Sequence, residues 1–259
     1  MKRIGFFLYG VITYLFFFAT FCYLAGFIGD AIVPKSVSTG TPGPVAPAIL
    51  VNLSLIILFG VQHTIMARIS FKQWWAQFVP QPIERTTFVL ITSVIFNLMF
   101  FFWQPLPGVI WSVDSQVGIA VLWGLFALGW LIVLASTFLI NHFDLFGLRQ
   151  VWLYLRGKEY TPLKFKKAGL YKYVRHPLML GFLIAMWAVP TMTASHLMFA
   201  ATMTLYIFLG VMVEEKTLVK LHGDSYRQYQ KSTPGFFPLP GKKNSEDLSR
   251  QVGLPVNAE

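Results

Sequence analysis

Uncharged apolar windows constrain this chain more than any other feature of its sequence. Four of them hold 18 or more residues without Asp, Glu, Lys or Arg: Ile4–Gly29, Val45–Met66, Thr86–Trp103 and Val117–Ile140. An α-helix rises about 1.5 Å per residue and a bilayer core is about 30 Å thick, so each window can cross it. The first window resembles a signal peptide, but it is too long and has no convincing cleavage site, which predicts a retained span.

Two shorter apolar windows follow, Leu178–Thr193 and Leu197–Val213, and the small-residue turn Thr191–Ser195 joins them. They predict a tight helical hairpin that need not cross the bilayer fully. Only 12% of the residues are charged, against about 25% in soluble domains, and the mean hydropathy is +0.58. The predicted fold class is therefore all-α: a polytopic membrane helical bundle of about six transmembrane helices, with a C-terminal interfacial helix.

The basic residues are distributed unevenly between the two predicted sides of the membrane. If the N-terminus is inside, 20 of the 21 Lys and Arg residues fall in the N-terminus, the inner loops and the tail, and the outer loops hold only Lys35. Inner loops of membrane proteins carry such an excess. The net charge of +10 therefore fits a membrane topology with both termini cytoplasmic, and we expect no nucleic-acid partner.

Polar residues inside the predicted spans are few. The first four windows contain no acidic or basic side chain, which argues against a proton-coupled transporter or an ion pump. His63 lies near the inner end of the second window, either as an interfacial histidine or as part of a pocket wall. The single cysteine, Cys22, excludes an intramolecular disulfide and a multi-cysteine metal site, and we expect no metal cofactor.

Charged residues gather at the inner ends of the predicted hairpin. Arg175 and His176 precede it, and Glu214 and Glu215 follow it. Because a hairpin places its two ends side by side, both pairs should meet at one inner mouth. Neighbours on a helix point about 100° apart, so one glutamate can face this mouth while the other faces the lipid headgroups. Such a site offers hydrogen-bond donors, acceptors and charges of both signs.

A spaced set of residues covers about 70 positions of the C-terminal third. Its members are Gly169, Tyr171, Arg175, His176, Pro177, Gly181, Glu214, Glu215, Leu218, Gly223, Tyr226, Tyr229 and Pro238. In this spacing the chain resembles the isoprenylcysteine carboxyl methyltransferase and phospholipid methyltransferase superfamily of integral membrane enzymes. The chain departs from the superfamily pattern in three ways: Met179 replaces a tyrosine, His222 replaces a phenylalanine, and no arginine stands just ahead of Glu214.

The resemblance implies that this half of the chain binds S-adenosyl-L-methionine as methyl donor. The residues it implies around the donor are Tyr171, Tyr173, Arg175, His176, Pro177, Met179, Gly181, Glu214, Glu215, Tyr226 and Tyr229. Their chemistry suits a zwitterion with a sulfonium: a carboxylate favours arginine, an ammonium favours glutamate, and a sulfur cation favours aromatic or soft side chains.

The N-terminal half narrows the resemblance. The stretches "GVQHTIMAR" (60–68) and "NHFDLFGLRQVWLYLRG" (141–157) resemble the nurim-type branch, and within it the bacterial methanethiol S-methyltransferases, over about Gly5–Pro240. This implies methylation of methanethiol to dimethyl sulfide in a bacterial inner membrane. Two alternatives stay open: a membrane methyltransferase acting on isoprenylcysteine, phospholipid or another small thiol, and a non-enzymatic nurim-like membrane protein. The sequence leaves the oligomeric state undecided.

The chain divides into three predicted parts. Residues 1–140 form a four-span membrane bundle, and residues 141–240 form the donor-binding catalytic half. The polar tail 241–259 is predicted to be disordered.

Methyl transfer to a thiol needs a thiolate, and an alkyl thiol is mostly protonated at pH 7. His142 and Asp144 stand two residues apart after the fourth span, and we predict that they act together as base and orienting carboxylate. His63 is the second candidate for the base. A nearby cation such as Arg149 would favour the thiolate.

Overall fold

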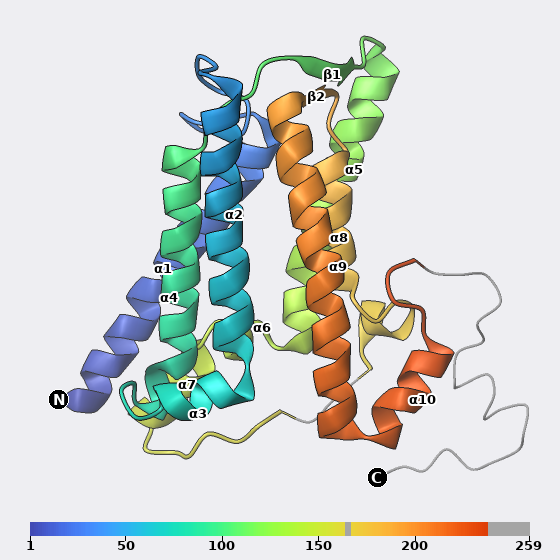
Figure 1. The fold of residues 1–259 in the computed structure, drawn as a ribbon. Coiled ribbons are helices and arrows are strands. Elements are labelled where there is room, and N and C mark those ends of the chain that lie inside the picture. Colours follow the sequence, from blue (N-terminus) through green and yellow to red (C-terminus); the bar gives the residue numbers. More distant parts are fainter. Residues whose placement is uncertain (164–166, 238–259) are drawn as a thin grey trace, which may run out of the picture.

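The chain folds into a bundle of long helices, which the computed structural model describes over residues 1–163 and 167–237 (Figure 1). The elements are α1 (Lys2–Gly29), α2 (Val45–Ala67), α3 (Ile69–Trp75), α4 (Gln81–Phe102), β1 (Val109–Ser112), α5 (Gln116–Ile140), α6 (His142–Leu145), α7 (Leu148–Leu155), the 3₁₀ helix η1 (Gly169–Lys172), α8 (Pro177–Trp187), β2 (Thr191–Thr193), α9 (Ala194–His222) and α10 (Asp224–Ser232). Within the described residues, α1, α2, α4, α5 and α9 are long and apolar enough to cross a membrane. The predicted helical membrane bundle is confirmed, while Pro238 and the tail 241–259 lie outside the described residues.

The long helices present apolar side chains outward. Only 11% of the most apolar window of α5 is buried, and Val117 and Leu131 on its surface are 74% and 62% exposed. Such surfaces are stable in lipid, where a helix also satisfies its own backbone hydrogen bonds. The chain is therefore a multi-pass membrane protein.

The two ends of the bundle differ in character. The N-terminus, α3, α7 and α10 lie together at one end, and β1 and β2 lie at the other (Figure 1). We call the first the cation-rich end, because the basic residues of 2–3, 68–85, 149–163, 167–175 and 216–231 lie there. The main core joins α1, α4 and α9 through Phe27, Trp103 and Phe199, whose rings pack edge to face.

The hairpin differs in detail from its predicted form. Helix α8 has 11 residues, about 16 Å of rise, whereas α9 has 29 and is a full span. Pro190 explains the early end of α8, because a proline disfavours helix in the residue before it. The predicted turn at Thr191–Ser195 is wrong in its first half, since Thr191–Thr193 pairs antiparallel with β1 as strand β2.

Two glycines set the distance between α5 and α8. A Cβ on Gly181 would lie 2.6 Å from the carbonyl oxygen of Gly129, and a Cβ on Gly129 would lie 2.7 Å from that of Gly181. Small residues let membrane helices approach to backbone contact. A third glycine, Gly223, has a φ of +56° and ends α9, so that the chain turns into α10.

Candidate active site

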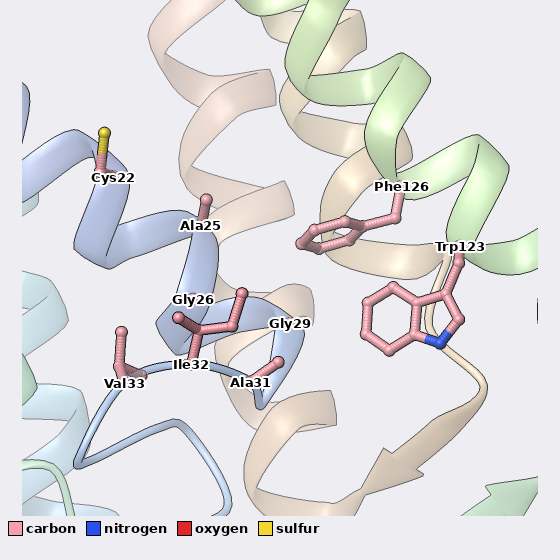
Figure 2. A pocket seen from close by; sticks show the side chains of 9 residues that line it. All are labelled: Cys22, Ala25, Gly26, Gly29, Ala31, Ile32, Val33, Trp123 and Phe126. Atoms are coloured by element: carbon pink, nitrogen blue, oxygen red, sulfur yellow. The ribbon is translucent and has the colours of Figure 1, made fainter.

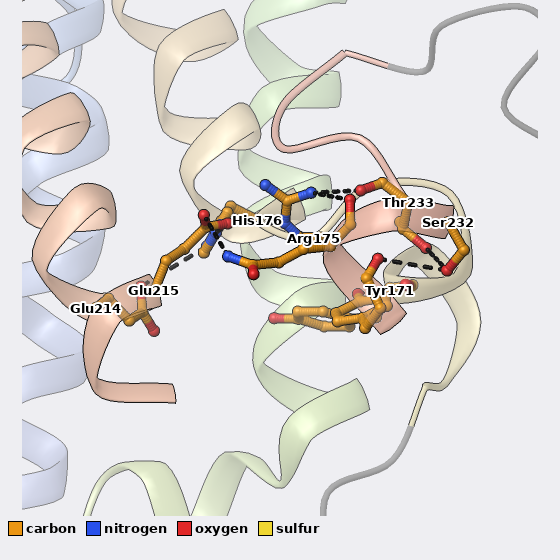
Figure 3. Close-up of polar contacts among 9 residues, drawn as sticks. Tyr171, Arg175, His176, Glu214, Glu215, Ser232 and Thr233 are labelled. Carbon is orange, nitrogen blue, oxygen red and sulfur yellow. Dashed lines mark hydrogen bonds and ion pairs between the residues drawn. The ribbon is translucent and has the colours of Figure 1, made fainter. Parts of the chain in front are cut away.

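The two ends of the α8–α9 hairpin meet at the cation-rich end, as predicted (Figure 3). Arg175 stands just before α8, and its Nε donates to Oε1 of Glu215 on α9 at 2.7 Å. Nε2 of His176 lies 3.0 Å from the same oxygen, and its Nδ1 lies 3.6 Å from Oε2 of Glu214. These four residues, from segments about 40 positions apart, form what we call the hairpin cluster.

The guanidinium of Arg175 is largely committed to its own chain. Its Nη1 donates to the carbonyl of Gln230 at 3.0 Å and to that of Thr233, at the end of α10. Its backbone N–H donates to the carbonyl of Pro234 at 2.9 Å. Charge-assisted bonds are the stronger class, so Arg175 ties α8, α9 and α10 together. Within the described chain, Nη2 is what Arg175 retains for a ligand.

The adjacent glutamates face different surroundings, as their helical spacing predicts. Oε2 of Glu215 accepts from Nε2 of Gln230 at 3.1 Å, so both carboxylate oxygens of Glu215 are bonded within the chain. Its side chain is 19% exposed, against 50% for Glu214. Glu214 is thus the carboxylate of the hairpin cluster with capacity left for a ligand.

The tyrosines predicted around the donor pack α10 against η1. Tyr226 and Tyr229 are 1% and 2% exposed, and their rings meet edge to face at 5.8 Å. The hydroxyl of Tyr229 donates to the carbonyl of Tyr171, and burial raises the pKa of Tyr229 to about 12. Tyr173 is 61% exposed and lies on the surface. In this structure the two α10 rings are therefore enclosed rather than open.

The predicted donor contacts on α8 have structural reasons of their own. Pro177 is the first residue of the helix, where its missing N–H costs no hydrogen bond. Met179 packs against the main core, and Gly181 lies at the crossing with α5. Contact of these residues with a donor stays a prediction.

The predicted pairing of His142 with Asp144 is wrong. Asp144 accepts from Nη1 of Arg149 at 2.8 Å and from the hydroxyl of Tyr160 at 3.2 Å. The imidazole of His142 is buried on the other side of α6 and bonds two hydroxyl groups instead. Neighbours in a helical turn point in different directions, so a spacing of two residues separates the two side chains. Burial lowers the pKa of His142, which keeps its imidazole neutral at pH 7.

His63 lies on α2 in an aromatic environment. Its ring contacts Phe59, Phe88 and Tyr206 at centroid distances of 5.4, 4.9 and 6.5 Å. Its buried Nδ1 has no hydrogen-bond partner in the described structure. Neither of the two cavities described below includes His63 in its lining, so a place in a pocket wall stays a prediction. Among the described residues, no group of three His, Cys, Asp or Glu is placed to hold a metal ion.

A polar cavity of about 830 Å³ opens at the cation-rich end beside Asp144. Its charged lining residues are Arg3, Lys72, Glu84, Arg85, Asp144, Lys158 and Glu159. Sequence reasoning missed Arg85 and Gln150 here. Nε of Arg85 donates to the carbonyl of Leu145 at 2.7 Å, and the buried Oε1 of Gln150 has no partner in the described chain. A cation at the start of an apolar window is the signal that could have indicated Arg85.

A second hollow, about 450 Å³, lies near the opposite end between α1 and α5 (Figure 2). Phe126 and Trp123 project toward it from α5, and Gly26 and Gly29 leave room on α1. Cys22 lines this hollow and is exposed. Its lining is almost wholly apolar, so it offers no acid or base.

Comparison with known proteins of similar sequence assigns the chain to a family. The chain is 48% identical to a methanethiol S-methyltransferase of Crocosphaera subtropica, over 92% of this chain and 93% of that protein. It is 52% identical to methanethiol S-methyltransferase 1 of Bradyrhizobium diazoefficiens, over 90% and 81% of the two chains. The chain belongs to the methanethiol S-methyltransferase family.

More distant similarity supports the predicted nurim-type branch, within which the methanethiol S-methyltransferases were placed. Nurim of Sus scrofa is 27% identical over 68% of this chain and 70% of its own length. No family model matches the chain, and no solved structure matches it.

Proposed function

We propose that the chain transfers the methyl group of S-adenosyl-L-methionine to methanethiol and releases dimethyl sulfide. The relatives that cover most of its length are named for methanethiol methylation. The observation that carries the proposal is the hairpin cluster, where Arg175, His176 and Glu215 form one ionic network beside the half-exposed carboxylate of Glu214. The basic residues of the loops favour an orientation with this end in the cytoplasm of a bacterial inner membrane.

The residues of the hairpin cluster fit a zwitterionic sulfonium donor. Glu214 supplies a carboxylate with unused capacity for an ammonium, and Nη2 of Arg175 supplies a donor for a carboxylate. When bound, such a donor supplies a methyl group already activated by positive sulfur. The chain then has to align the acceptor and exclude water, which can contribute about 7–11 kcal/mol. Seven further residues are proposed to contact the donor on the resemblance alone: Tyr171, Tyr173, Pro177, Met179, Gly181, Tyr226 and Tyr229.

The acceptor is small, apolar and soluble in lipid, whereas the donor is charged and soluble in water. At the end of the membrane spans, the acceptor can arrive from the lipid and the donor from the water. The hairpin cluster lies at such an end. Of the predicted catalytic residues, His142 remains our proposed final acceptor of the thiol proton and His63 the second candidate. Arg149 and Asp144 neutralise each other at 2.8 Å, so their proposed role is to position α6 and α7.

The test is headspace analysis of the purified protein in lipid nanodiscs supplied with both substrates. We expect dimethyl sulfide in proportion to the protein, and none when either substrate is omitted. Methylated lipid or protein without dimethyl sulfide would support the alternative acceptors. Calorimetry without acceptor is the second measurement, because a non-enzymatic membrane protein should show no donor binding.

A further inference from the structure

The imidazole of His142 is held by hydroxyl groups on both nitrogens. Nε2 lies 2.7 Å from the Oη of Tyr14 on α1, and Nδ1 lies 2.8 Å from the Oγ1 of Thr137 on α5. The ring also stacks on Phe138 at 4.3 Å with an interplanar angle of 7°. His142 is 4% exposed, so the two hydroxyl groups, and not water, are its hydrogen-bond partners.

The proton order along this chain of bonds follows from Thr137. A hydroxyl has one proton to donate, and that of Thr137 is donated to the carbonyl of Leu134 at 2.7 Å. Thr137 must therefore accept from Nδ1–H of His142. In the neutral imidazole Nε2 then carries the lone pair, and the hydroxyl of Tyr14 donates to it. The oxygen of Tyr14 keeps its acceptor capacity for a further group.

Lipid-facing aromatic side chains surround Tyr14. Phe18, Phe138 and Phe143 are 44%, 56% and 51% exposed on the bundle surface. The rings of Phe18 and Phe143 lie 6.5 and 6.4 Å from that of Tyr14. A small apolar thiol dissolved in the bilayer would meet the Tyr14 hydroxyl through this aromatic surface, whereas His142 lies behind it.

The charged groups around α6 bond to one another or to the backbone. The imidazole of His142 is therefore bonded to the hydroxyl groups of Tyr14 and Thr137. Asp144 of α6 pairs with Arg149 of α7 and accepts from Tyr160. Arg85 of α4 donates to a backbone carbonyl of α6, and α1 contributes Tyr14. The proposed donor side is connected to this region through η1, because Gly169 of η1 lies against the side chain of Leu139 at the end of α5.

We propose that Tyr14 is the residue that deprotonates the acceptor thiol, with His142 as the proton store behind it and Thr137 as a positioning residue. This rests on the proposed function. The S–H bond breaks and its proton joins Oη of Tyr14 while the phenolic proton moves to Nε2 of His142. The thiolate sulfur forms a bond to the methyl carbon, and the electron pair of the broken carbon–sulfur bond stays on the donor sulfur. The proton on His142 returns through Tyr14 to water after product release.

The variant Tyr14→Phe tests the proposal, with Tyr9→Phe as matched control. Tyr9 lies on the same helix and bonds Thr87 on α4 at 3.1 Å, so its variant also removes one interhelical hydroxyl contact. We expect kcat/KM for methanethiol to fall about 100-fold at pH 7 in Tyr14→Phe, with donor affinity unchanged, and less than about twofold in Tyr9→Phe. The deficit should shrink about tenfold per pH unit as thiolate forms in solution. Equal effects of the two variants, or a deficit constant with pH, would overturn the proposal.

A measurement without turnover covers the case in which Tyr14→Phe fails to fold. Side-chain ¹⁵N NMR of the wild-type protein, assigned by loss of the signal in His142→Gln, should show the Nδ1–H tautomer, and Thr137→Val should shift it toward Nε2–H. The Nε2–H tautomer in the wild type would overturn the proton order. If the wild type makes no dimethyl sulfide, the proposed function fails, whereas active wild type with unaffected Tyr14→Phe rejects this inference alone.

Discussion

The hairpin cluster and the surroundings of His142 both concentrate polar groups at the cation-rich end, but they use them differently. In the hairpin cluster, Glu215 bonds Arg175, His176 and Gln230 and so joins three helices. Around His142, Asp144 pairs with Arg149, and the imidazole hydrogen-bonds to two hydroxyl groups. One region is an ionic clamp, and the other is a neutral chain of hydrogen bonds.

This difference teaches which groups can act on a ligand. A charge whose bonds are completed by its own chain holds the fold, and removing one partner leaves the other buried and unpaired. A group with remaining capacity is available for chemistry. By that criterion Glu214 and the Oη of Tyr14 are the chemically available groups of the two regions, although each stands beside a better-connected neighbour.

The largest expected effect is that of Glu215→Ala. It leaves Arg175 and His176 without their shared carboxylate in a site where their side chains are only 13% and 6% exposed. We expect a loss of about 3–5 kcal/mol in the free energy of unfolding. Denaturant unfolding in detergent measures it, and a loss as small as that of Glu214→Ala would contradict the clamp.

Glu214→Gln should have the opposite profile. Because its carboxylate is half-exposed, we expect little change in stability but about a tenfold loss of donor affinity, or about 1.4 kcal/mol. Calorimetric titration with the donor measures this, with Glu84→Gln as a control carboxylate outside the hairpin cluster. An unchanged affinity would remove Glu214 from the donor site.

Asp144→Asn should affect the second region more weakly. The pKa of Tyr160 is raised by burial and also by Asp144, so removing the carboxylate should lower that pKa. The phenolate absorbance, assigned by its loss in Tyr160→Phe, reports the shift. We expect an effect on stability below about 1 kcal/mol, and a larger one would make this pair a second clamp.

The last effect is absent at neutral pH and appears only in acid. Burial lowers the pKa of His142 below its unfolded value of about 6.5, so below that pH the unfolded chain binds a proton that the folded chain resists. Stability should therefore be unaffected by His142 at pH 8 and fall below about pH 6.5, by at most about 1.4 kcal/mol per pH unit. Thermal unfolding of wild type and His142→Gln from pH 8 to 5 measures this. Parallel curves would show that the imidazole is not held neutral.

Much of the architecture could be predicted because it depends on local composition. A window such as Val117–Ile140 identifies a span by itself, since lipid accepts apolar side chains on every face of a helix. The meeting of Arg175 with Glu215 could also be predicted, because a hairpin brings its ends together. The strand β2 could not, because three residues acquire it only by pairing with β1, about 80 positions earlier.

The amino-acid sequence by itself determined the spans, the accumulation of cations at one end and the chemistry available at the hairpin mouth, because these follow from residue type and short spacing. Only the tertiary structure decided how that chemistry is divided. It committed Glu215 to the fold and left Glu214 half-exposed, and it bonded His142 to Tyr14, 128 positions away, rather than to nearby Asp144. Hydrogen-bond partners are chosen by direction and distance in space, which helix packing sets and sequence spacing does not.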